Sequence, residues 1–155
     1  MMYDLFTNFY LMSAVFAWLV AQLIKTLTGF FKLQEFSVRT LLFGTGGMPS
    51  SHTAAVCAMT TACAIKQGFH SPLFAICAIL SMVVMIDATG VRRETGKQSK
   101  ALNIIVEEMF SSKDAKALDM SFKELVGHSP LQVVFGVITG IVVSCLLSLI
   151  PVFAA

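Results

Sequence analysis

Long uncharged apolar stretches, separated by short polar segments, dominate the chain. The first runs from Leu5 to Ile24 without a charged residue, and its length suits one crossing of a hydrocarbon core about 30 Å thick. Three further apolar stretches follow, the second beginning near Pro49 after the Gly-, Pro- and Ser-rich break GTGGMPSSH. The pattern therefore predicts about four membrane-spanning helices, over residues 5–24, 49–66, 72–91 and 129–152.

The segment 92–128 has a different character, because charged and helix-forming residues replace the apolar stretches. Within it, LNIIVEEMF places apolar residues at helical spacing, which predicts one amphipathic helix at the membrane surface. In the last span, Gly136 and Gly140 form a GxxxG arrangement typical of close helix packing. The expected fold is all-α, an integral membrane helical bundle forming a single domain over residues 1–155.

Composition supports a membrane protein and excludes other classes. The 155 residues are 56% hydrophobic and 13% charged, with a mean hydropathy of +0.79. A soluble domain typically has about 45–50% apolar and about 25% charged residues, and a disordered chain is more polar still. The net charge of +2 gives no indication of a nucleic-acid partner. The four cysteines lie in apolar stretches, without the spacing of disulfides or metal ligands. Any chemistry must use helix ends and short loops.

The positive charges are distributed asymmetrically. If four spans alternate, residues 25–52 and 92–128 share one side of the membrane, and both termini share the other. The first side holds ten of the eleven lysines and arginines: Lys25, Lys32, Arg39, Arg92, Arg93, Lys97, Lys100, Lys113, Lys116 and Lys123. The positive-inside rule makes that side cytoplasmic and places the N- and C-termini outside.

Three segments on the basic side carry residues suited to binding an anion. KLQEFSVR supplies Lys32 and Arg39, MPSSH opens the second span, and GHSPLQVVFG opens the last span. DATGVRRETGKQ, at the exit of the third span, adds Arg92 and Arg93. The N–H groups and the dipole at a helix N-terminus favour a phosphate, and arginine binds its oxygens with paired donors. The pattern therefore indicates a phosphate site.

Two histidines belong to these segments. His52 ends MPSSH, and His128 precedes the last span. In phosphoryl transfer one imidazole can attack phosphorus while another protonates the departing oxygen. Each histidine alone would more simply be a structural residue, but their position within the basic segments favours a catalytic role.

These motifs resemble the signatures of a known superfamily. The spacing Lys32-x6-Arg39, the sequence PSSH at 49–52, and His128-x3-Gln132-Val133-x2-Gly136 are similar to the three motifs of the phosphatidic acid phosphatase type 2 superfamily, which includes vanadium haloperoxidases. GGMPSSHTA, DATGVRRETGKQ and KELVGHSPLQVVFG together resemble its divergent bacterial and plastid branch, over about residues 1–151.

The resemblance implies specific roles for the residues at matching positions. It implies four phosphate-binding residues: Lys32, Arg39, Ser50 and Ser51. His128 would be the nucleophile that forms a phosphoenzyme, and His52 the acid for the leaving group. The implied mechanism needs no metal or cofactor, although phosphate or vanadate would occupy the site.

The sequence departs from the superfamily pattern at four positions. Thr40 replaces a proline and Ser51 a glycine, and Phe122 stands where the third motif has an arginine, so that we expect Arg92 or Arg93 to substitute. A fourth departure, Gln132, occupies the position of a carboxylate that orients the nucleophilic imidazole.

Glutamine can accept the same hydrogen bond as that carboxylate but contributes no charge. Asp87 and Glu124 are the candidates for the missing charge. Asp87 is of particular interest, because an acid near the end of a span is costly without a partner.

The expected function is an integral membrane lipid phosphatase that hydrolyses a phosphate monoester through a phosphohistidine. For a site on the cytoplasmic face of the bacterial cytoplasmic membrane, phosphatidylglycerophosphate is the favoured phospholipid substrate. The alternative is a catalytically weak or inactive module that binds anionic lipids or transports lipid phosphates, because Gln132 is neutral. Four spans are few for the superfamily, which suggests a homodimer.

Overall fold

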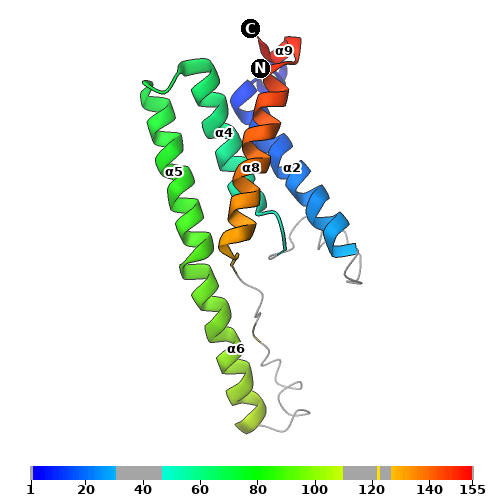
Figure 1. Ribbon diagram of the computed structural model, residues 1–155, viewed down its shortest axis with the longest axis vertical. Coiled ribbons are helices and arrows are strands. Elements are labelled where there is room, and N and C mark those ends of the chain that lie inside the picture. Colours follow the sequence, from blue (N-terminus) through cyan, green and yellow to red (C-terminus); the bar gives the residue numbers. More distant parts are fainter. Residues whose placement is uncertain (1, 31–46, 110–121, 123–126, 155) are drawn as a thin grey trace.

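The computed structural model of the protein describes residues 2–30, 47–109, 122 and 127–154, and the regular elements of that part of the chain are helices (Figure 1). Their bounds are Met2–Phe6 (α1), Phe9–Phe30 (α2), Ser51–Gln67 (α4), Pro72–Thr89 (α5), Val91–Met109 (α6), Pro130–Ser148 (α8) and Pro151–Ala154 (α9). The prediction of an all-α membrane bundle is confirmed. The predicted residues Lys32, Arg39 and Glu124 lie outside the described residues.

Three helical segments among the described residues are long and apolar enough to cross a membrane: 9–28, 72–106 and 130–148. The second expected span corresponds to α4, which has 17 residues, is rich in alanine, threonine and cysteine, and is not one of these three segments. Its composition suits its position, because α4 packs against α2, α5 and α8. A helix enclosed by other helices needs small side chains for close approach more than it needs lipid-compatible ones.

The contact between α4 and α8 is very close. A Cβ atom added to Gly136 would lie 2.7 Å from the carbonyl oxygen of Ser50, and one added to Gly140 would lie 2.4 Å from that of Ala54. Only glycine fits at such distances, so the predicted close packing at the GxxxG arrangement is confirmed.

One face of α2 packs against the same core. Phe9, Ser13, Ala17 and Ala21 follow each other at intervals of four residues and are all buried. Residues four apart lie on one face of a helix, and here that face contacts alanines of α4. The next position in this series is Lys25.

The ends of two spans differ from those expected. The first helical span begins at Phe9 rather than Leu5, because Asn8 precedes it and its Oδ1 accepts a hydrogen bond from the Leu11 N–H at 3.0 Å. The last span ends at Ser148 rather than near 152, and Pro151 opens the short helix α9.

The helices alternate in direction, so that their ends form two groups (Figure 1). Both termini and the α4–α5 turn lie at one end of the bundle, whereas the start of α4, the α5–α6 junction and the start of α8 lie toward the other. Beyond the bundle, α6 continues approximately in line with α5 (Figure 1). This grouping of the helix ends is the one expected if the predicted spans alternate in direction.

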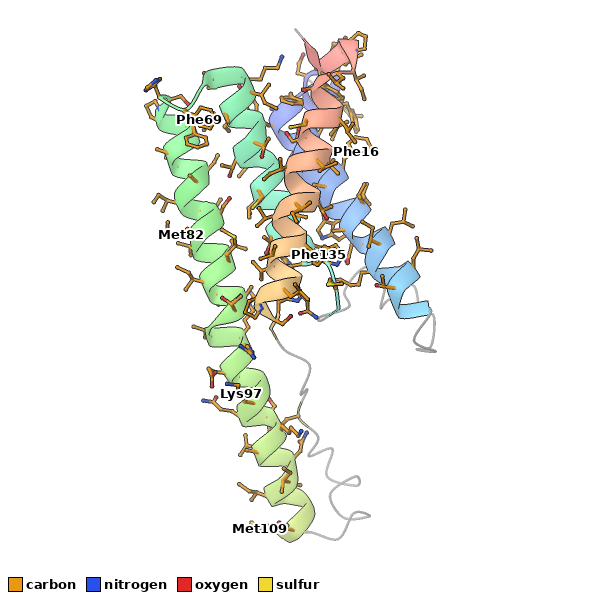
Figure 2. The ribbon with its side chains drawn as sticks, in the orientation of Figure 1. Phe16, Phe69, Met82, Lys97, Met109 and Phe135 are labelled. Carbon is orange, nitrogen blue, oxygen red and sulfur yellow. The ribbon has the colours of Figure 1, made fainter. Side chains whose placement is uncertain are left out.

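Large apolar side chains cover the outside of the bundle (Figure 2). Phe16 on α2, Met82 on α5 and Phe135 on α8 are exposed by 42%, 51% and 43%. Such side chains on every outer helix are typical of a surface that faces lipid rather than water.

Candidate functional site

The start of α8 is organised by Gln132. Ser129 is the N-cap, and its hydroxyl accepts a hydrogen bond from the Gln132 N–H at 3.4 Å. In return, Gln132 Oε1 accepts from the Ser129 N–H at 2.9 Å, which completes a capping box. The same Oε1 lies 3.2 Å from Nδ1 of His128. The Gln132 side-chain oxygen therefore takes part in capping α8 and also orients the imidazole of His128, the predicted nucleophile.

This arrangement assigns the tautomer of His128. A backbone N–H can only donate, so the Gln132 atom facing Ser129 is the carbonyl oxygen, which can only accept. The neighbouring Nδ1 of His128 must then carry the hydrogen. The lone pair is left on Nε2, the nitrogen that a nucleophilic histidine needs.

The backbone before α8 fixes the place of His128. Its N–H donates to the carbonyl oxygen of Ala88, near the end of α5, at 2.9 Å. The preceding Gly127 has φ +88°, and a Cβ there would lie 2.5 Å from the backbone nitrogen of Arg93. Two separate reasons therefore require glycine at this position: the backbone conformation, and the close contact with the backbone of the α5–α6 junction.

Ser50 and Ser51, predicted to bind phosphate, are both buried at the start of α4. The Ser50 hydroxyl caps the helix, accepting from the Thr53 hydroxyl at 2.9 Å and from the Thr53 N–H at 3.4 Å. The Ser50 N–H donates to the main-chain carbonyl oxygen of Gln132 at 3.0 Å, and this hydrogen bond joins α4 to α8. The structure thus gives Ser50 a capping and connecting role. The N–H groups of Ser51 and His52 begin the helix, where no earlier turn can accept from them.

His52 is exposed on the first turn of α4, close enough to His128 to affect its charge. Burial lowers the pKa of His128, and the hydrogen bond with Gln132 opposes this effect. The charges of Lys25, His52 and Arg92 lower that pKa further. His128 is therefore neutral at pH 7, the form in which Nε2 can attack.

The predicted residues of the α5–α6 junction separate into different roles. Arg92 Nε donates to Asp87 Oδ2 at 2.5 Å, so Asp87 pairs with Arg92 and not with the Gln132–His128 unit. Of the two arginines, Arg92 is the one whose charge reaches both histidines. Arg93 contributes its backbone, against which Gly127 packs.

The structure adds Lys25, which the sequence reasoning missed as a site residue. A Cβ on Gly47 would lie 3.1 Å from Lys25 Cγ, so the lysine stem rests against the segment leading into α4. Its charge also reaches both His52 and His128. The signal in the sequence was the interval of four residues along the buried face of α2, which Lys25 continues.

Phe122 stands where the superfamily motif has an arginine. Its N–H donates to Asn103 Oδ1, and its carbonyl oxygen accepts from Asn103 Nδ2, each at 2.9 Å. It is therefore held against α6. In the described part of the chain, no group of three or more histidines, cysteines and acids is arranged to hold a metal ion.

These features define a helical integral membrane protein in which two histidines, an arginine and a lysine gather at one end of the bundle. The chain belongs to the Divergent PAP2 family, whose model matches residues 6–143. This match confirms the predicted relationship to a divergent branch of the superfamily.

A relative of similar length is known from Bacillus subtilis (strain 168). The chain is 40% identical over 154 residues to its "Uncharacterized membrane protein YuiD", covering 94% of this chain and 97% of the relative. No solved structure matches the chain.

Proposed function

We propose that this protein is an integral membrane phosphatase that hydrolyses a phosphate monoester of a lipid, with a phosphohistidine formed at His128. The observation that carries the proposal is the contact between Gln132 Oε1 and His128 Nδ1. It leaves the Nε2 lone pair available in an imidazole that its surroundings keep neutral. The neighbouring His52, Arg92 and the N-terminus of α4 supply an acid and an anion-binding environment.

The reaction then has two balanced steps. In the first, His128 Nε2 forms a bond to phosphorus, the bond from phosphorus to the lipid oxygen breaks, and His52 gives its proton to that oxygen. In the second, neutral His52 takes a proton from water, whose oxygen attacks phosphorus and releases His128. The sum is ester plus water giving lipid alcohol plus phosphate.

The surroundings of His52 support a lipid substrate. Ala55, Val56 and Met59 follow it at helical spacing and are half-buried, so they extend an apolar face from His52 along α4. The exterior of the bundle is apolar as well. A lipid can therefore keep its tails in the bilayer while its phosphate reaches the histidines. Phosphatidylglycerophosphate at the cytoplasmic face of a bacterial cytoplasmic membrane is the substrate we favour.

The test is phosphate release from phosphatidylglycerophosphate and phosphatidic acid by the purified protein in detergent micelles. His128→Ala should abolish release, whereas His70→Ala should not, because His70 is exposed in the α4–α5 turn at the opposite end of the bundle. Equal hydrolysis of a soluble monoester such as p-nitrophenyl phosphate would refute the lipid preference.

The neutral side chain of Gln132 favours a second candidate, a module that binds or transports lipid phosphates without turnover. The group that accepts the hydrogen bond from His128 Nδ1 is a neutral amide oxygen, and the nearby Asp87 is paired with Arg92. Phosphate binding by a folded protein that releases none from either lipid would identify this function.

A further inference from the structure

We propose that Lys25 binds the phosphoryl group directly, as a cationic ligand that α2 contributes to the site. This inference rests on the proposed function, because it assigns a ligand to the same phosphate. The ligand class is a tetrahedral phosphate oxyanion, either on a lipid headgroup or free in solution.

The face of α2 directs Lys25 toward the start of α4. Ser13, Ala17 and Ala21 lie on that face and are fully buried. Ala17 and Ala21 share a core cluster with Ala54 and Ala58 of α4. Since Lys25 is one further step along the face, its stem leaves α2 on the side of α4.

The end of α2 is also attached to the segment that enters α4. The Thr28 hydroxyl donates to the carbonyl oxygen of Met48 at 3.3 Å, and Lys25 Cγ packs on Gly47. The two contacting residues of α2 are three positions apart, and they contact two adjacent residues, Gly47 and Met48, just before Ser50. The lysine stem is thereby held against the segment that leads into α4.

The charges around the two histidines support a direct role. The charges of both Lys25 and Arg92 act on His52 and on His128, so both cations belong to the surroundings of the two histidines. A lysine within a membrane span is costly, and such residues commonly mark a functional site. A flexible stem lets the ammonium act as a point charge on a phosphate oxygen.

The experiment measures binding of inorganic phosphate to the detergent-solubilised protein by calorimetry and ³¹P NMR. Lys25→Met keeps the aliphatic stem on Gly47 and removes the charge, so it should weaken binding about 10- to 100-fold. Lys25→Arg should retain most of the affinity. The matched control is Lys66→Met, because Lys66 lies over the Phe9 ring near the opposite end of the bundle and should leave binding unchanged.

Lys32→Met provides the direct competitor, because the motif resemblance assigns phosphate binding to Lys32. Undiminished phosphate affinity in Lys25→Met overturns the assignment of Lys25, whatever Lys32→Met does. Absence of phosphate binding by the native protein overturns it as well.

The experiments can refute the phosphatase function and the role of Lys25 separately. If phosphate binding depends on Lys25 but neither lipid is hydrolysed, the assignment stands and the phosphatase function falls. If lipids are hydrolysed and Lys25→Met binds phosphate normally, the function stands and the assignment falls.

A measurement on the native chain covers the case in which Lys25→Met does not fold. Reductive methylation followed by mass spectrometry reports the accessibility of each lysine. Inorganic phosphate should slow labelling of Lys25 and leave labelling of Lys66 unchanged. Equal labelling of Lys25 with and without phosphate would overturn the assignment.

Discussion

Replacing Gln132 with glutamate tests the central contact of the site. The side chain occupies the third position of α8, where a capping box accepts glutamate as readily as glutamine. A negative charge in the first turn of a helix is also favourable, by about 0.3–1 kcal/mol. We therefore expect the fold to persist while the partner of His128 becomes a carboxylate.

The expected electrostatic effect follows from the 3.2 Å between the side-chain oxygen and His128 Nδ1. At that separation a unit charge pair is worth about 5 kcal/mol at an effective dielectric constant of about 20, and about 1.3 kcal/mol in water. Measured carboxylate–cation pairs change a pKa by about 1 to 3. The carboxylate favours the imidazolium, so the pKa of His128 should rise by an amount in that range.

The assay is an NMR titration of the histidine ring signals in detergent micelles, with His128→Ala to assign the resonance. Gln98→Glu is the matched control, because it makes the same substitution at an exposed position on α6. Compared at a pH above the raised pKa of His128, turnover should also rise at least about tenfold, since the comparable loss of a carboxylate in a serine protease triad costs about 10⁴-fold. A His128 pKa that stays unchanged or falls in Gln132→Glu would refute the reasoning.

Three further predictions concern pH and two glycines. Burial lowers the pKa of His128 below its ordinary 6.5, so protonation of this nucleophile should reduce phosphate release only below pH 6.5, whereas the need for a protonated His52 should reduce release toward alkaline pH and make the profile bell-shaped; folding stability should fall as the pH drops below 6.5, because the unfolded chain binds the proton more tightly. A decline in kcat/KM that already begins above pH 7 as the pH is lowered would contradict this prediction for His128. Gly127→Ala should destabilise the protein by more than about 2 kcal/mol and reduce activity, whereas Gly68→Ala, with a similar φ of +74° and open space around its Cβ, should cost only about 1–2 kcal/mol. Thermal unfolding in detergent measures both, and equal losses would show that the contact at Gly127 is unimportant. Gly140→Leu should force α8 away from α4 and lower the unfolding temperature, and wild-type stability in this variant would disprove the close contact with Ala54.

The sequence was sufficient for the helices that face lipid, because their outer side chains must be apolar along the whole crossing. It also placed α4 within about two residues, because the proline and serines before it begin the helix, although this enclosed helix carries small and polar side chains that do not stand out in hydropathy. The start of α2 was placed too early because apolar residues precede the capping Asn8 and belong to a separate short helix.

Within the site, the motifs predicted two histidines that the structure brings together. The hydrogen bond that glutamine was expected to accept is present between Gln132 and His128. The roles of charged residues were harder to infer, because they depend on which side chains meet across helices. Asp87 pairs with Arg92, and Lys25 looked like the ordinary polar boundary of a span until the packing of α2 was known.

Two backbone hydrogen bonds have a consequence for how this end of the protein can change during evolution. The Ser50 N–H binds the Gln132 carbonyl oxygen, and the His128 N–H binds that of Ala88, so the ends of three helices are joined without using a side chain. Any residue except proline can keep such a bond. Apart from Gly127, Gly136 and the capping side chains, residues around the joined ends can therefore be exchanged one at a time while the scaffold stays in register, which makes this end of the bundle a good starting point for selecting new specificities in the laboratory.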